Sequence, residues 1–219
     1  MTYTSGLSKY LHFLLDYDGL IVDTEKLYFK TWCEVLTEEG QKICRRFHEG
    51  RHESEVYEKV KLYLKKSMSL EEVSRYRKSM FKKLMDQGNL EPMDGIKMLL
   101  EKLKQIAPLS IVSNSTSAVV KEGLISTGLA GYFQKYICVN SRLQLKPAPD
   151  LYLKAVSVLD VDTRSLLALE DSTTGILSAQ AAGVSVVCIN PKQIMQSVCL
   201  QYRVLYYKSP LDFLNYFSD

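Results

Sequence analysis

The stretch LHFLLDYDGLIVDTE, residues 11–25, joins an apolar run to two aspartates that lie one residue apart. Residues 11–15 have the composition of a buried strand, and Asp16 and Asp18 follow at once. Two carboxylates at the end of a buried strand cost roughly several kcal/mol to desolvate unless cations or hydrogen-bond donors compensate. Mg²⁺ prefers carboxylate oxygens, and Gly19 lacks a Cβ, so the backbone can approach closely. The stretch therefore suggests a cation site, although an ordinary turn with two aspartates stays open at this point.

Further along the chain, short apolar runs alternate with helical patterns. The predicted strands are residues 109–113, 165–170 and 184–189, with residues 136–140 as a weaker fourth run. Alternating strands and helices are typical of a parallel sheet with helices on both faces, in which loops at the carboxyl ends of the strands build the active site. We therefore predict an α/β fold.

Residues 25–90 interrupt this alternation, because they carry helical patterns and no credible strand. One amphipathic pattern is predicted to end at Gly40, and a second spans residues 56–64. A third begins with Ser69 followed by Glu72, the spacing of a capping box. We predict an all-helical insert.

The domain boundaries follow from that insert. Residues 1–24 and 91–219 are predicted to form the sheet-containing core, and residues 25–90 to form the helical domain. The stretch NLEPMDG, residues 89–95, would be the hinge by which the chain returns to the core.

Composition excludes several classes of protein. The 219 residues include 28 Lys+Arg and 25 Asp+Glu, a net charge of +3 that indicates neither nucleic-acid binding nor an acidic tail. Five cysteines show no zinc-ligand spacing, and their odd number suits a reducing compartment better than a disulfide framework. No apolar run reaches the roughly 20 residues of a membrane span, and the first run is too short for a signal peptide. We expect a cytoplasmic protein that is a monomer or a weak dimer.

Polar residues also follow the other predicted strands. Ser113 and Asn114 follow the second run, Lys146 lies in LKPAPD, and Glu170 and Asp171 follow SLLAL. In a parallel sheet these residues would converge at one edge with the aspartate pair. A nucleophilic carboxylate, a lysine, hydroxyl donors and hard oxygen ligands together fit phosphoryl transfer through a covalent intermediate.

Each of these residues also has a structural explanation. Ser113 and Asn114 could cap the following helix, and Lys146 could be a solvated surface lysine. Glu170 and Asp171 could cap a helix that begins near Gly175. The functional interpretation rests on their joint order and on their placement at strand ends.

Four segments carry a family resemblance. DYDGLIVDTE, IVSNST, LKPAPDLY and LALEDSTTGILSAQAAGV resemble, in order, the four motifs of the haloacid dehalogenase superfamily. The closest resemblance is to its phosphatases and phosphomutases, which have a helical cap inserted after the first motif. It runs from Leu11 to Asn190 and implies a Rossmann-like core with residues 25–90 as the cap.

The resemblance also implies residue roles. Asp16 would be the nucleophile that becomes an aspartyl-phosphate, and Asp18 would be the general acid and then the general base. A Mg²⁺ cofactor would be held by four acidic residues, Asp16, Asp18, Glu170 and Asp171. The phosphoryl oxygens would be held by Ser113, Asn114 and Lys146.

Among the activities of this family, a phosphatase is favoured. The dehalogenases lack the second aspartate, which this chain keeps as Asp18. The hexose-phosphate mutases resembling this chain carry a histidine where it has Tyr28. We therefore predict a magnesium-dependent phosphomonoesterase acting on a small phosphorylated metabolite. A β-phosphoglucomutase-like sugar phosphomutase and a catalytically idle binding protein remain the alternatives.

Substrate selection is expected to come from the cap. Arg51, in FHEGRHESEV (residues 47–56), could hold a second anionic group of the substrate, although a solvated polar connection between helices explains it equally well. Glu25 occupies a common family position at the hinge, where it could contact substrate or fix the hinge geometry.

Overall fold

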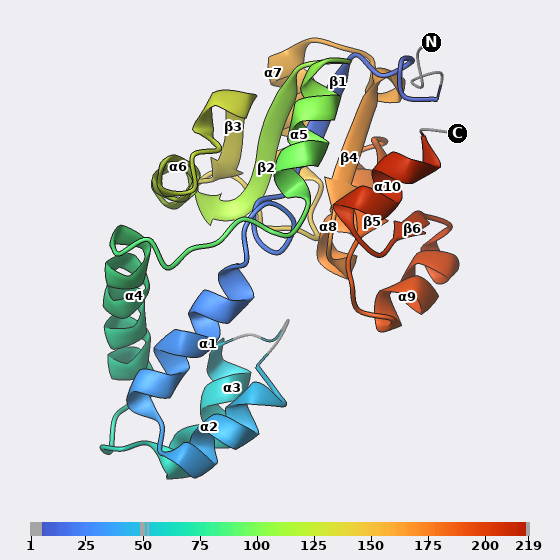
Figure 1. Cartoon of the computed structure of the whole chain (residues 1–219). Helices are drawn as coiled ribbons and strands as arrows, with labels where there is room; N and C mark the ends of the chain where they lie inside the picture. The colour runs from blue at the N-terminus through green and yellow to red at the C-terminus, as the bar shows by residue number, and fades with distance from the viewer. Residues whose placement is uncertain (1–5, 49–50, 52, 218–219) are drawn as a thin grey trace. The chain divides into compact units, whose positions relative to one another are not determined.

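The computed structural model describes residues 6–48, 51 and 53–217, and within them the chain forms six strands and ten α-helices (Figure 1). The strands are β1 (His12–Leu15), β2 (Leu109–Thr116), β3 (Phe133–Val139), β4 (Leu166–Glu170), β5 (Ser185–Ile189) and β6 (Leu205–Tyr207). The helices are α1 (Thr24–Val35), α2 (Glu38–Arg45), α3 (Glu53–Val60), α4 (Leu70–Asp86), α5 (Ile96–Lys104), α6 (Ser117–Ser126), α7 (Asp150–Leu159), α8 (Thr173–Ala181), α9 (Ile194–Tyr202) and α10 (Pro210–Tyr216).

The chain divides into two compact units. Residues 1–22 and 92–219 form one, here called the sheet unit, and residues 23–91 form the other, here called the helical unit. Each is described by itself below.

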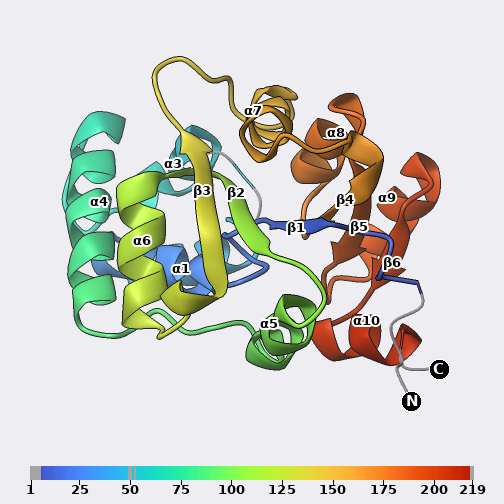
Figure 2. The same ribbon diagram turned by 90° about the horizontal axis from the view of Figure 1, so that it is seen from above.

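The sheet unit contains one parallel sheet with the strand order β3-β2-β1-β4-β5-β6. Helices α7 and α8 cover one face, and α5 and α10 cover the other (Figure 2). This confirms the predicted α/β fold, and all four apolar runs that follow the first one form strands. The short edge strand β6 was not predicted.

Burial on both faces explains why β1 is continuously apolar. Phe13, Leu14 and Leu15 are fully buried, and Leu14 packs in a cluster with Leu151 of α7 and Ala179 of α8. Burying one such large apolar side chain contributes about 1.5–3 kcal/mol. The chain leaves the sheet at the polar residue that comes next, Asp16, so the hydrophobic pattern itself places this carboxylate at the carboxyl end of a central strand.

The helical unit has its own hydrophobic core. Its buried members come from all four helices and their connections: Trp32, Val35, Leu36, Cys44, Val56, Val60 and Val73. The predicted capping box at the start of α4 is confirmed, because the Glu72 amide donates to the Ser69 hydroxyl over 3.3 Å and the Ser69 amide donates to the Glu72 carboxylate over 2.8 Å.

The predicted helix end at Gly40 is wrong. Helix α1 ends at Val35, Leu36 is extended, and Gly40 lies in the first turn of a separate helix, α2. The glycine serves close packing there, because a Cβ on it would lie 2.6 Å from the Cβ of Tyr63. Gly40 is needed for close packing, and the sequence alone does not distinguish a glycine of this kind from one that ends a helix.

The five cysteines are free thiols, and four of them are buried. The four buried cysteines act as small core residues. Among the described residues, no helix combines the length and the apolar composition that crossing a membrane requires.

Candidate active site

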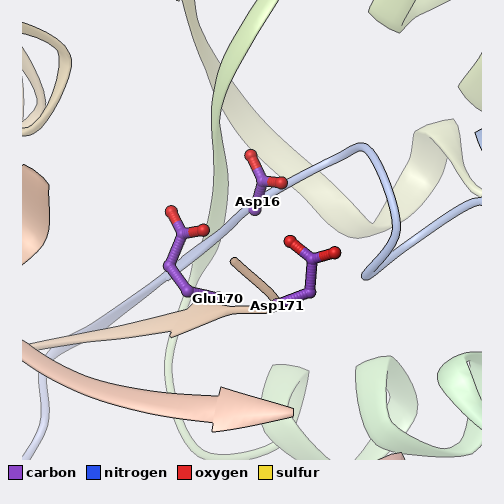
Figure 3. A group of neighbouring side chains, drawn as sticks. All are labelled: Asp16, Glu170 and Asp171. Carbon is purple, nitrogen blue, oxygen red and sulfur yellow. The ribbon is translucent and has the colours of Figure 1, made fainter. Parts of the chain in front are cut away.

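Three carboxylates meet at the carboxyl ends of the two central strands (Figure 3). Asp16 follows β1, Glu170 is the last residue of β4, and Asp171 comes next. Each offers an oxygen that lies within 4.8 Å of the oxygens of the other two. The parallel pairing of β1 with β4 brings these residues together, as the sequence pattern predicted.

Lys146 joins this group from the loop before α7. Its ammonium group donates to Asp16 Oδ1 over 2.7 Å, to Glu170 Oε1 over 2.6 Å and to the Val112 carbonyl over 2.7 Å. Burial opposes the charge of Lys146, but the Asp16 and Glu170 carboxylates outweigh it and raise its pKa. Lys146 is therefore a buried, charged residue, and the alternative of a solvated surface lysine is wrong.

The acidic side chains outnumber the cation beside them. Burial has the largest effect and raises the pKa of Glu170. Lys146 lowers this pKa and Asp16 raises it, and together they leave it raised to about 7. Burial and the charges of Asp16 and Glu170 raise the pKa of Asp171 well above its ordinary value. One lysine therefore does not offset the ionised forms of all these carboxylates, and their raised pKa values reflect this.

Two glycines make room for the acidic side chains. Gly19 has a φ of +78°, and a Cβ on it would lie 2.2 Å from Asp171 Oδ2. At Gly175, in the first turn of α8, a Cβ would lie 1.7 Å from Glu170 Oε2. Both carboxylates therefore need a glycine beside them, and the glycine of the opening stretch has both a conformational and a packing reason.

Asp18 has its own hydrogen-bond partners on β2. Its Oδ2 accepts from the Ser115 hydroxyl over 2.8 Å and from the Ser113 hydroxyl over 3.3 Å. The Ser113 hydroxyl also accepts from the Ser115 amide over 2.9 Å. Asn114 instead contacts the backbone of Lys146, whose amide donates to its Oδ1 over 2.8 Å. The roles of Ser113 and Asn114 in phosphate binding stay predictions.

With this geometry established, comparison with known proteins identifies the family. The family model of haloacid dehalogenase-like hydrolases matches residues 13–189, more than half of the chain. The chain belongs to the haloacid dehalogenase-like hydrolases.

Relatives of this hydrolase cover most of its length. The fructose-1-phosphate phosphatase YqaB of Escherichia coli strain K12 is 25% identical over 186 residues, which are 82% of this chain and 96% of that protein. The phosphorylated carbohydrates phosphatase of Thermotoga maritima is 27% identical over 180 residues, 78% of this chain and 81% of that protein. The solved structure of the haloacid dehalogenase-like protein SP0104 of Streptococcus pneumoniae covers 96% of this chain and 99% of its own, with a TM-score of 0.74 at 17% identity. That likeness shows a common fold.

The acidic cluster of this haloacid dehalogenase-like hydrolase fits a divalent cation. Its donors are hard carboxylate oxygens, and Glu170 Oε2 is a buried oxygen without a hydrogen-bond partner among the described residues. A cation beside Asp16, Glu170 and Asp171 would offset the ionised forms of these carboxylates, which Lys146 alone does not.

Sequence reasoning missed three residues of the site. Ser115 orients Asp18, the Tyr152 hydroxyl donates to Glu170 Oε1, and the Asn190 side-chain amide donates to the Asp171 carbonyl over 2.8 Å. Ser115 and Asn190 are polar residues at strand ends, the same signal that singled out Ser113. Tyr152 gave no such signal, because it occupies an apolar helix position next to Leu151.

The two predicted substrate residues lie in the helical unit. Glu25 Oε2 is 3.9 Å from Nε2 of the buried His48, and the Arg51 amide donates to the His48 carbonyl over 3.2 Å. The Arg51 guanidinium lies 4.2 Å from the centre of the Phe47 ring. Both residues therefore border His48. Gly50 and His52, which belong to the same predicted loop, lie outside the described residues.

Proposed function

We propose that this hydrolase is a magnesium-dependent phosphomonoesterase that acts on a small phosphorylated metabolite through an aspartyl-phosphate on Asp16. The observation that carries the proposal is the buried contact of Lys146 with Asp16 inside a cluster of three carboxylates. Both relatives described above are named as phosphatases of phosphorylated carbohydrates or of fructose 1-phosphate, which supports the same reaction class.

Asp16 would act as the nucleophile. Lys146 holds its Oδ1, so the second carboxylate oxygen is the one that would form the new bond to phosphorus. The bond between phosphorus and the leaving oxygen breaks in the same step. The ammonium group of Lys146 offsets the negative charge that gathers around the transferring group.

Asp18 would move the protons. It donates a proton to the leaving oxygen in the first step, and it then accepts one from the water that attacks the aspartyl-phosphate. That second step restores the Asp16 carboxylate and releases inorganic phosphate. Ser113 and Ser115 fix the Asp18 carboxylate for this role.

Mg²⁺ would be held by carboxylate oxygens of Asp16, Glu170 and Asp171 and by Asp18, for which the family resemblance implies the backbone carbonyl. When bound, the ion would neutralise charge on the phosphoryl oxygens and orient them for in-line attack. Its binding would also relieve the repulsion among the carboxylates.

We propose the helical unit, with predicted bounds 25–90, as the cap that selects the substrate. Arg51 would pair with an anionic group beyond the transferred phosphate, and Glu25 would accept hydrogen bonds from substrate hydroxyls. The Arg51 side chain is about half exposed and lies 3.4 Å from Glu55, so substrate would compete with that exposed ion pair. Exposed pairs of this kind contribute only about 0–1 kcal/mol, which a substrate phosphate can exceed.

Tyr28 favours hydrolysis over the mutase alternative. Its ring stacks on Phe81, with ring centres 4.6 Å apart, at the position where the mutases carry a histidine. A tyrosine hydroxyl exchanges protons less readily near neutral pH than a histidine imidazole.

Five free cysteines also support the proposed cytoplasmic location, where thiols stay reduced.

Phosphate release from a panel of phosphomonoesters tests the proposal. The panel contains fructose 1-phosphate, other hexose phosphates, phosphoglycolate, nucleoside monophosphates and pseudouridine phosphate, each with and without Mg²⁺. We expect release that depends on Mg²⁺, concentrates on one substrate class and disappears in Asp16→Asn. Release by Asp16→Asn at the wild-type rate would remove the nucleophile from the mechanism. Conversion of one hexose phosphate isomer to another, without net release, would favour the mutase.

A further inference from the structure

The hydroxyl of Tyr152 has an unusual position for a residue on the core face of a helix. Tyr152 lies on α7, its side chain is fully buried, and its hydroxyl donates to Glu170 Oε1. The same oxygen accepts from Lys146 over 2.6 Å. Since a hydrogen bond to a buried carboxylate is worth more than one between neutral groups, this hydroxyl holds Glu170 firmly.

The position of the other carboxylate oxygen of Glu170 is set by packing against Gly175. Oε2 has no hydrogen-bond partner among the described residues and lies where a Cβ on Gly175 would be. The Glu170 side chain is therefore placed by two donors on Oε1 and by contact with the glycine at Oε2. Of the two donors, only Tyr152 makes no bond to Asp16, because Lys146 divides its hydrogen bonds between Glu170 and Asp16.

We propose that Tyr152 is a positioning residue for the active site: its hydroxyl holds Glu170 beside Asp171, and this leaves Lys146 free to engage Asp16. The proposal rests on the proposed function, because the carboxylates are taken to bind Mg²⁺ and Asp16 to attack phosphate. Tyr152 would affect the bound ion and the reacting phosphate only through Glu170.

The hydroxyl is the part of Tyr152 that packing does not require. The ring lies in a cluster of apolar residues around Leu14, Leu151 and Ala155, where phenylalanine would fill the same space. Without the hydroxyl, Lys146 would be the one remaining donor to Glu170 among the described residues. Glu170 would then be able to shift, and Lys146 would shift with it away from Asp16.

The test compares Tyr152→Phe with Tyr207→Phe. Tyr207 is also buried in the sheet unit, and its hydroxyl has no hydrogen-bond partner among the described residues, so its substitution controls for the loss of a buried hydroxyl. Direct Mg²⁺ titration by calorimetry and the steady-state constants are measured for both variants. Substitution of a residue that orients a metal ligand commonly costs about 10–100-fold in metal affinity or activity.

We expect Tyr152→Phe to weaken Mg²⁺ binding by about 10-fold and to lower kcat by a similar factor, with KM changed by less than about 2-fold. Tyr207→Phe should match the wild type in all three. Wild-type Mg²⁺ affinity and kcat in a folded Tyr152→Phe protein would overturn the proposal. A purely structural role would lower the unfolding temperature and leave Mg²⁺ affinity unchanged.

A second measurement asks whether Tyr152 acts through Glu170. In a Glu170→Ala background, Tyr152→Phe should change Mg²⁺ affinity by less than about 2-fold, because the acceptor of the Tyr152 hydroxyl is gone. The full effect in that background would overturn the proposal. Should Tyr152→Phe not fold, Gly175→Ala displaces the same carboxylate from its other side and should also weaken Mg²⁺ binding; wild-type affinity in that variant would contradict a need to fix Glu170.

The experiments distinguish failure of the positioning role of Tyr152 from failure of the proposed phosphatase function. If the wild type releases phosphate from no substrate, the phosphatase proposal fails, while the Mg²⁺ titrations still decide the role of Tyr152. If the wild type is active and Tyr152→Phe equals it, only the positioning role fails.

Discussion

Among the described residues, each of the two units buries one lysine or arginine beside carboxylates, and the surroundings of the two cations differ. Arg77, in the helical unit, and Lys146, in the sheet unit, are both 6% exposed. Arg77 pairs with one carboxylate, Glu53, and its Nε donates to the Thr31 hydroxyl over 3.0 Å. Its guanidinium also lies 3.8 Å from the centre of the Trp32 ring. Lys146 instead contacts two carboxylates, and a third and a fourth lie close by.

The charge balance distinguishes the two roles. One cation, one anion and an aromatic ring satisfy each other, so the Arg77 group needs no ligand and connects the helices of its unit. Around Lys146 several carboxylates share one cation, which raises the pKa of Glu170 and Asp171 and suits the binding of a further cation. A buried ion pair with balanced charges indicates little about function. A buried cluster in which the carboxylates outnumber the cation instead points to a ligand site.

The largest contrast should be in catalysis. Lys146→Met removes the charge that faces Asp16 and the transferring phosphoryl group, and we expect kcat to fall by about 10³-fold. Arg77→Met removes a cation of the same burial from the helical unit, and kcat of the folded protein should stay within about 3-fold of the wild type. Comparable losses in both variants, measured by phosphate release per folded molecule, would break the comparison.

Loss of the Arg77 ion pair should destabilise the helical unit. Glu53→Ala leaves the buried guanidinium of Arg77 without its carboxylate, and we expect a loss of about 3 kcal/mol in the free energy of unfolding. Trp32 is the single tryptophan of the chain and contacts Arg77, so its fluorescence during urea unfolding reports on this unit.

Glu58→Ala is the matched control for that measurement, because Glu58 forms an exposed pair with Lys61 in the same unit. Its urea transition should coincide with that of the wild type. If Glu53→Ala also unfolds at the wild-type urea concentration, the Arg77 pair does not stabilise the helical unit.

A smaller effect is expected from His12, which the sheet unit buries as a neutral group at the start of β1. Burial, with the charge of Lys135 adding to it, lowers the pKa of His12 to about 4, and its Nε2 lies 2.8 Å from the Ser110 hydroxyl. The unfolded chain takes up this proton near pH 6.5 and the folded protein only near pH 4, so the contribution of His12 to stability should fall as the pH drops through that window. The loss is at most about 3 kcal/mol.

Urea unfolding between pH 7 and pH 4.5 checks this expectation. His12→Gln should flatten the pH dependence of the unfolding free energy, and His48→Gln, at the buried histidine of the helical unit, serves as the comparison. A wild-type slope in His12→Gln would show that other groups cause the acid sensitivity.

The sequence predicted those strands and site residues that belong to a hydrophobic pattern several residues long. Apolar runs followed by polar residues located Asp16, Glu170 and Asp171 at the ends of parallel strands, and the charge of Lys146 marked it as a candidate. The three-residue strand β6 carries too short a pattern, and Gly40 carries the same signal in a tight contact as at a helix end.

Contacts between distant residues account for the rest. Lys146 and Asp16 lie 130 residues apart in the chain, and the pairing of Tyr152 with Glu170 depends on how α7 packs on the sheet. A tyrosine in an apolar stripe has the same pattern whether or not its hydroxyl finds a carboxylate. Such residues become visible only when each buried polar atom is matched with its partner.

The most direct test of the charge imbalance is the unfolding temperature of the wild type and Asp171→Asn, each with and without millimolar Mg²⁺. The account predicts that Mg²⁺ raises the wild-type temperature, because a ligand of the folded state stabilises it by mass action. Without Mg²⁺, Asp171→Asn should unfold at a higher temperature than the wild type and respond far less to the ion. A wild-type temperature indifferent to Mg²⁺, together with an Asp171→Asn variant less stable than the wild type, would contradict the account.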